Sequence, residues 1–252
     1  MKQAMRRAFL SALLAAALGS AAAAQDTCHL PPLGTVTVAS VQDGRTLTLV
    51  DGRVLRLAAI EIAGNSGEAL RSLVDGQALR LEALSPERDR YDRIVAFAFV
   101  GDAKKPLQQV LLEQGQAIVG ARVGDKACAA ILLAAESAAR GARRGIWADP
   151  NSAPLSAEHS DGLTARRGRF ALVEGKVLSV RESGATIYVN FGRRWTRDFT
   201  VTIARRLQRT FAAAGLAPGS LAGRRIRVRG WIEQRSGPII AADAPEQIEL
   251  LD

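Results

Sequence analysis

The chain has 252 residues, of which 48% are hydrophobic and 23% are charged, and its formal net charge is +9. This length and apolar content suffice for one large or two small cores and exclude a disordered tail. With only 2 histidines and 2 cysteines, the chain cannot build a multi-histidine or cysteine-rich zinc site. It also lacks the glycine-rich phosphate-binding loops of nucleotide-cofactor folds. Any chemistry must therefore use carboxylates and arginines.

The first 24 residues have the three-part pattern of a secretory signal peptide. Lys2, Arg6 and Arg7 come first, an apolar run covers 8–18, and small residues occupy 22–24. The apolar run is well short of the roughly 20 residues that span a bilayer. We therefore predict a signal peptide over 1–24, cleavage after it, no membrane anchor in the mature protein, and a periplasmic or secreted location.

Export changes the interpretation of the two cysteines. An oxidising compartment favours a disulfide over a redox or metal site. We therefore predict a bridge between Cys28 and Cys128. The alternative is a pair of buried free thiols.

The excess positive charge lies in the C-terminal part of the chain. Residues 25–150 contain 15 basic and 15 acidic residues, whereas residues 151–252 contain 16 basic and 10 acidic residues. Fifteen of these 16 are arginines, which suit forked contacts with phosphate, although a genome that favours arginine gives the same bias. The stretch 151–162 mixes Pro, Ser and Gly without a helical or strand period. We predict that it is a linker between a domain over 25–150 and a domain over 163–252.

The first domain shows alternating apolar and polar residues in short runs, followed by helical spacing. The order of elements is that of a small Greek-key, OB-type barrel with a C-terminal helical flank. The expected fold class of the chain is mainly β with flanking helices (α+β), as two tandem small barrels. The predicted elements are strands 35–38, 46–49 and 53–62, helix 67–74, strands 78–83 and 94–100, and helices 106–114 and 125–144.

Three segments of this domain carry a family resemblance. They are Val41–Leu49 followed by Arg56–Glu61, then Asp89–Ala96, and Glu136–Trp147. In order and spacing, residues 35–148 resemble the thermonuclease (staphylococcal-type nuclease) family. The resemblance implies hydrolysis of DNA and RNA phosphodiesters with Ca²⁺. In that chemistry carboxylates hold the ion, a glutamate activates water and two arginines neutralise the charge of the transition state.

The resemblance assigns the family's site residues to positions of this sequence. Arg56 and Arg93 match the two arginines and are the predicted catalytic residues. Asp43 and Glu61 match carboxylates of the metal site and are the predicted, incomplete metal ligands. For the two arginines, the alternative is a surface ion pair with neighbouring carboxylates, which contributes at most ~1 kcal/mol.

Two positions depart from the family pattern. Arg45 stands where the family has a second aspartate, and Gly64 stands where it has the catalytic glutamate. Ca²⁺ takes about six to eight oxygens, so two carboxylates beside an arginine form a poor cage. We therefore expect weak or no cleavage. No cofactor is assigned, and Ca²⁺ or another divalent cation is expected only if the protein is an active nuclease.

The second domain has a similar alternation of short strands around one helical stretch. Its order, three strands, a helix and two strands, is again that of a five-stranded OB-type barrel. The predicted elements are strands 170–180, 186–191 and 199–203, helix 205–214, and strands 225–231 and 239–242.

Basic and aromatic residues occur together in this domain. Grooves that combine cations with stacking rings hold single-stranded nucleic acids without sequence preference. Three of the arginines share one strand face, because successive side chains alternate. The predicted nucleic-acid-binding residues are Arg193, Arg194, Trp195, Arg225, Arg227, Arg229 and Trp231. The alternative places the aromatic residues in the core and the arginines on a solvated face.

We carry three functional hypotheses forward. The preferred one is an exported thermonuclease-family protein that binds nucleic acid or another polyanion, with a degenerate metal site. The second is an active metal-dependent endonuclease. The third is an envelope protein-interaction module.

Overall fold

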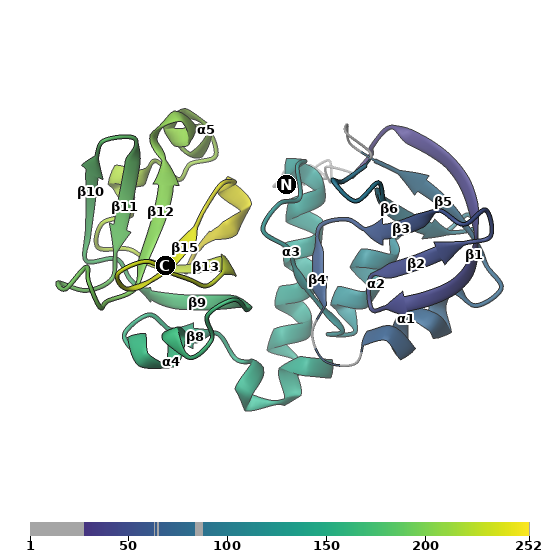
Figure 1. Ribbon diagram of the computed structural model, residues 1–252, viewed down its shortest axis with the longest axis horizontal. Helices are drawn as coiled ribbons and strands as arrows, with labels where there is room; N and C mark the ends of the chain where they lie inside the picture. The colour runs from purple at the N-terminus through teal and green to yellow at the C-terminus, as the bar shows by residue number, and fades with distance from the viewer. Residues whose placement is uncertain (1–27, 63, 65, 84–87, 252) are drawn as a thin grey trace, which may run out of the picture.

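The computed structural model describes residues 28–62, 64, 66–83 and 88–251. The predicted signal peptide lies outside these residues. Across the described ranges, no helix is long and apolar enough to cross a membrane. Figure 1 shows a closed barrel in the N-terminal half of the chain and a second group of strands in the C-terminal half. The helix α3 (Lys126–Gly141) lies between them.

The N-terminal half is a closed five-stranded barrel with the order β1-β2-β3-β6-β5. β3 and β6 run parallel, and the other neighbours are antiparallel. The β2–β3 hairpin turns at Gly52, whose φ of 84° is a conformation that favours glycine. The strands are β1 (Pro32–Asp43), β2 (Thr46–Leu49), β3 (Val54–Leu57), β5 (Ala78–Glu82) and β6 (Ile94–Val100).

Three helices and a two-stranded ribbon flank the barrel. The ribbon pairs β4 with β7 antiparallel, with Ile60 opposite Val119. The expected strand 53–62 is divided into β3 and β4, because Ala59 adopts a positive φ of 63° between them. The flanking elements are α1 (Ser66–Val74), α2 (Leu107–Glu113), β4 (Ile60–Ile62), β7 (Ala117–Val119) and α3.

The disulfide joins the start of the described chain to α3. Cys28 and Cys128 are bonded, with Cα atoms 4.5 Å apart, which confirms the predicted bridge. Asp125 caps the same helix, because its carboxylate accepts a hydrogen bond from the Cys128 N–H at 2.9 Å. The first turn of α3 is thus held by a covalent bond and a cap.

The C-terminal half contains a five-stranded sheet, β10-β11-β12-β15-β14, and a four-stranded sheet, β16-β13-β9-β8. β9 leads within a few residues into β10, and β13 leads into β14, so two bent chain segments connect the sheets around one core. β12 and β15 run parallel, as β3 and β6 do in the barrel. The strands are β8 (Leu155–Ser156), β9 (Phe170–Lys176), β10 (Ser179–Ser183), β11 (Thr186–Asn190), β12 (Thr200–Ala204), β13 (Arg225–Trp231), β14 (Glu233–Gln234), β15 (Pro238–Ala241) and β16 (Ile248–Leu250).

The remaining helices are short, and they lie either between α3 and β8 or between these strands. The segment 151–162, which we expected to be a linker, includes β8, and β8 pairs with β9 in the four-stranded sheet. This segment is therefore packed as part of the C-terminal half. The helices are α4 (Ser160–Thr164) and α5 (Gln208–Ala213), with the 3-10 helices η1 (Gly145–Ala148), η2 (Pro150–Ser152), η3 (Arg205–Leu207), η4 (Pro218–Leu221) and η5 (Pro245–Gln247).

The two halves are in direct contact through α3. A small apolar cluster combines Ala139 of α3 and Trp147 of η1 with Leu172 of β9. A carboxylate oxygen of Glu246 also accepts hydrogen bonds from the N–H groups of Val123 and Gly124. The C-terminal half is thus packed against the N-terminal half.

Candidate nucleic-acid interface

A hollow of about 810 Å³ beside the barrel brings together the two arginines that we predicted as catalytic. Arg56 comes from β3, where Leu55 and Leu57 are buried in the core, so alternation directs Arg56 away from it. Arg93 immediately precedes β6. We call this site the arginine hollow, and its lining residues are Arg56, Asp89, Arg90, Tyr91, Arg93 and Val95.

Asp89 organises the loop that carries Arg93. Its carboxylate accepts hydrogen bonds from the N–H groups of Tyr91 and Arg93, at 2.9 and 3.2 Å. The Arg93 guanidinium adds two more, from Nε at 2.8 Å and Nη2 at 2.6 Å. Burial acts to raise the pKa of Asp89, but these hydrogen bonds hold it below the usual 3.8. Arg93 therefore forms the local ion pair that we considered as its alternative, and it does so at the wall of the hollow.

Tyr91 gives the arginine hollow an aromatic surface. Its side chain is 62% exposed. The guanidinium carbons of Arg90 and Arg93 lie 4.8 and 5.0 Å from its ring centroid. Guanidinium groups on a ring are a favourable cation–π arrangement, and an exposed ring can also stack on a base. The sequence analysis did not assign this tyrosine, although its position between Arg90 and Arg93 was a usable signal.

Arg45 occupies the side of the site where the family pattern expects an aspartate. Its guanidinium forms an ion pair with Glu61 of β4 and donates a hydrogen bond to the Ile60 carbonyl at 2.8 Å. The second carboxylate oxygen of Glu61 lies 3.9 Å from Nη2 of Arg56. One carboxylate thus faces two guanidinium groups.

The site holds more positive than negative charge around Arg56. The pKa of Arg56 is lowered, first by burial and then by the charges of Arg45 and Arg93, while Glu61 and Asp89 act in the opposite direction. A group whose charged form is disfavoured in this way gains from a bound anion. The arginine hollow is therefore suited electrostatically to a phosphate.

The two predicted metal ligands do not fit a divalent cation. Asp43 accepts hydrogen bonds on one oxygen from the Arg45 N–H at 2.8 Å and on the other from the Thr46 hydroxyl at 3.1 Å. Glu61 is engaged by Arg45 and Arg56. Ca²⁺ requires a full shell of oxygen ligands, and the described residues contain no group of three or more potential metal ligands. The carboxylates of Asp43 and Glu61 are therefore already paired with arginines and hydrogen-bond donors of the chain itself.

A second hollow, of about 840 Å³, lies over β10, β11 and the loop that follows β11. Arg181 and Tyr188 are directly opposite each other on the paired strands. Trp195, 70% exposed, and Arg193 reach it from the loop. We call it the tryptophan hollow, and its lining residues are Leu178, Ser179, Arg181, Glu182, Ser183, Tyr188, Asn190, Gly192, Arg193 and Trp195.

The loop 192–198 also borders a third hollow, of about 680 Å³, on its other side. Arg193, Arg194 and Arg197 line this hollow together with His159. The loop is held by the Arg194 N–H, which donates to the Asp198 carboxylate at 2.7 Å. The predicted residues Arg193, Arg194 and Trp195 therefore lie together, on one loop between two hollows.

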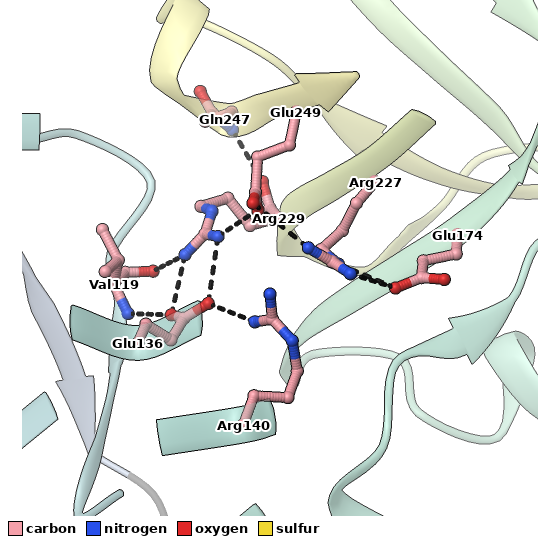
Figure 2. A network of polar contacts seen from close by, with 8 residues as sticks. All are labelled: Val119, Glu136, Arg140, Glu174, Arg227, Arg229, Gln247 and Glu249. Carbon is pink, nitrogen blue, oxygen red and sulfur yellow. Dashed lines mark hydrogen bonds and ion pairs between the residues drawn. The ribbon is translucent and has the colours of Figure 1, made fainter. Parts of the chain in front are cut away.

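The arginines of β13 require a correction. Arg225 is exposed, but Arg227 is mostly buried between Glu174 and Glu249, at 2.7 and 3.1 Å. Arg229 is fully buried and bonded to Glu136 of α3 and to Glu249 (Figure 2). The face that period two assigns to these arginines is covered by α3 and by carboxylates of neighbouring strands. The prediction that Arg227 and Arg229 bind nucleic acid is therefore wrong in this packing.

Trp231 lies apart from the other aromatic candidates. It ends β13, is partly exposed, and packs edge-on against Phe170 with ring centroids 5.8 Å apart. It lines neither the arginine hollow nor the tryptophan hollow. The contact that we describe for Trp231 is with Phe170, its partner residue on β9.

Part of the chain matches a known protein family. Residues 58–149 match the family described as Staphylococcal nuclease homologue. The matched segment includes Glu61, Arg93 and Trp147, and it begins after Arg45 and Arg56. No curated protein matches the chain. The match supports a thermonuclease-like domain in the N-terminal half, and with it a nuclease-like or nucleic-acid-binding function.

Proposed function

We propose that this protein binds single-stranded nucleic acid, with the arginine hollow as a phosphate site, and that it cleaves phosphodiesters weakly or not at all. The carrying observation is that Arg56 and Arg93 share one hollow with the exposed ring of Tyr91. Guanidinium groups hold phosphate through forked hydrogen bonds, and the ring offers a face to a base.

The second domain supports the same proposal with a separate surface. Tyr188 and the exposed Trp195 supply rings beside Arg181 and Arg193. Unpaired bases can reach such rings, whereas bases stacked in a duplex cannot, so this arrangement favours single strands. The domain's pairing pattern, with parallel β12 and β15 as in the barrel, supports an OB-type fold for 163–252.

Two further parts of the proposal concern the whole chain. The three-part pattern of residues 1–24 and the Cys28–Cys128 disulfide support export to an oxidising compartment. The separate cores of the two halves support a division into two domains near residue 150.

Fluorescence anisotropy with a labelled single-stranded oligonucleotide tests binding. The affinity should fall with salt by about 0.7 log units per log unit for each phosphate neutralised. Arg56→Gln should weaken binding and flatten this slope. Arg53→Gln is the matched control, because Arg53 pairs with Asp51 on the exposed β2–β3 hairpin. Salt-independent binding, or an equal loss in both variants, would contradict the phosphate site.

A cleavage assay separates this proposal from an active endonuclease, which the family match also favours. Plasmid and single-stranded substrates are incubated with Ca²⁺, Mg²⁺ or Mn²⁺. We expect little or no cleavage, because Asp43 and Glu61 are already engaged by the chain's own donors. Metal-dependent cleavage that disappears in Arg56→Ala or Arg93→Ala would establish the endonuclease instead.

A further inference from the structure

The buried ion pair between Arg229 and Glu136 connects the second domain to the first (Figure 2). Arg229 lies on β13, and Glu136 lies on α3. The guanidinium donates to both carboxylate oxygens, from Nη1 at 2.9 Å and from Nη2 at 3.1 Å. Both side chains are almost completely buried. Burial acts to lower the pKa of Arg229, but Glu136 and Glu249 outweigh it and raise the pKa, so the guanidinium stays charged.

The ion pair also binds the backbone of Val119 through both its N–H group and its carbonyl group. The Val119 N–H donates to the Glu136 carboxylate at 2.6 Å, and the Val119 carbonyl accepts from Nη1 of Arg229 at 3.1 Å. Figure 2 shows both groups of Val119 turned toward the ion pair. A residue of β7 in the first domain is thus fixed by a side chain of the second domain.

β7 passes this restraint to β4. In the two-stranded ribbon, Val119 lies opposite Ile60 and Ile118 lies opposite Glu61. The Gly120 N–H also donates to the Ala59 carbonyl at 2.7 Å. The position of β4 therefore depends on the position of β7.

β4 in turn carries the groups that bind Arg45 next to the arginine hollow. Arg45 is bonded to the Ile60 carbonyl and to the Glu61 carboxylate, whose other oxygen faces Arg56. An unbroken series of contacts thus runs from Arg229 through β7 and β4 to Arg56. The last of these contacts, between Glu61 and Arg56, is an ion pair at 3.9 Å. A displacement at Val119 that passes through the ribbon therefore changes the position of the Glu61 carboxylate relative to Arg45 and Arg56.

We propose that Arg229 is a positioning residue for the anion site of the first domain: by clamping Val119, it fixes β4 and hence the arrangement of Glu61, Arg45 and Arg56. The proposal rests on the proposed phosphate site for its functional consequence. Arg229 itself touches no ligand, since it is buried between the domains. The second domain thus completes the first one in addition to offering its own surface.

The test uses the full mature chain and two readouts for Arg229→Met. Without ligand, hydrogen exchange at the Gly120 amide reports the β4–β7 ribbon. With inorganic pyrophosphate as the probe, the Arg56 Nε–Hε resonance reports affinity at the arginine hollow. We expect exchange to accelerate about tenfold and the pyrophosphate affinity to fall at least about fivefold.

Glu174→Gln is the control, because Glu174 pairs with Arg227 inside the second domain and has no described contact with Val119. It should change both readouts by less than about twofold. Arg229→Lys keeps the charge but loses the fork, so it should give intermediate values. If Arg229→Met does not fold, Arg229→Lys takes its place. The Gly120 exchange rate and the pyrophosphate affinity of Arg229→Lys are then compared with those of Glu174→Gln, and equal changes in the two variants would overturn the positioning role.

Two results would overturn the positioning role: a folded Arg229→Met protein with exchange and affinity like the wild type, or equal changes in Arg229→Met and Glu174→Gln. If the Arg56 resonance of the wild type does not shift when pyrophosphate is added, the phosphate site is contradicted. In that case the Gly120 exchange rates still decide whether Arg229 positions the ribbon.

Discussion

The guanidinium of Arg45, in the turn between β1 and β2, forms an ion pair with the carboxylate of Glu61 on β4. The family resemblance expects two carboxylates at these positions, facing a common cation. In this chain one of the two carries the positive charge itself. Arg45 thus neutralises the Glu61 charge within the protein, and the site keeps an excess of positive charge around Arg56.

This ion pair predicts how the protein responds to Ca²⁺. Ligand binding to the native state at 100 times Kd would stabilise it by about 2.7 kcal/mol. We expect no such gain, since Glu61 is already paired with Arg45. Thermal unfolding in millimolar Ca²⁺ and in chelator should give the same midpoint. Arg45→Asp frees Glu61 and adds a carboxylate, so Ca²⁺ should raise the midpoint of that variant. A wild-type midpoint that rises equally would contradict the interpretation.

The two arginines of the hollow should differ in their effect on stability. Arg56→Met removes a guanidinium whose charge is disfavoured by burial and by Arg45 and Arg93, so the free energy of unfolding should not decrease. Arg93→Met removes two hydrogen bonds to Asp89, and it should cost about 1–3 kcal/mol. Urea unfolding measures both. An equal decrease in the free energy of unfolding in both variants would mean that Arg56 stabilises the fold and is not kept for anion binding.

The sequence predicted the features that depend on local pattern or chemistry. Alternation in the segments of β1 and β2 predicted barrel strands, and the predicted signal peptide led to the prediction of the Cys28–Cys128 bridge. It did not predict the burial of Arg229. Period two assigns residues to a strand face, but it does not reveal what covers that face. The covering group, Glu136, is 93 residues away in the chain and belongs to a helix.

Removal of the disulfide should lower stability without changing the fold. The bridge spans 100 residues of sequence. In the chain-entropy model, a loop of this size contributes up to about 4.7 kcal/mol by restricting the unfolded chain. Urea unfolding of Cys28→Ser/Cys128→Ser measures the loss. Reductant should destabilise the wild type and leave this variant unaffected. A wild-type free energy that is insensitive to reductant would indicate that the bridge contributes little.

Trp195 should matter for binding and not for stability. The ring is largely exposed, so its removal uncovers no core. Loss of one stacked base costs about 1–3 kcal/mol, so Trp195→Ala should weaken oligonucleotide affinity by about 5- to 150-fold. Trp195→Phe keeps a ring and should retain most of the affinity. An unchanged affinity in Trp195→Ala would exclude the tryptophan hollow from the interface.

The network of ion pairs around Arg229 should also determine how the protein responds to acid. Burial acts to raise the pKa of Glu249, but Arg229, Arg227 and Arg140 outweigh it and hold the pKa below the usual 4.5. A carboxylate with a depressed folded-state pKa stabilises the protein above its unfolded-state value. That stabilisation is lost as the pH falls through the folded-state value.

The free energy of unfolding should therefore decrease below about pH 4.5, and Glu249→Gln should show a shallower acid limb. Glu233→Gln serves as the control, because Glu233 is exposed on β14 and belongs to no described ion pair. Urea unfolding between neutral pH and pH 3 measures the three proteins side by side. The difference between wild type and Glu249→Gln should be largest at neutral pH and should shrink with acid. A constant difference would place the acid sensitivity outside this network.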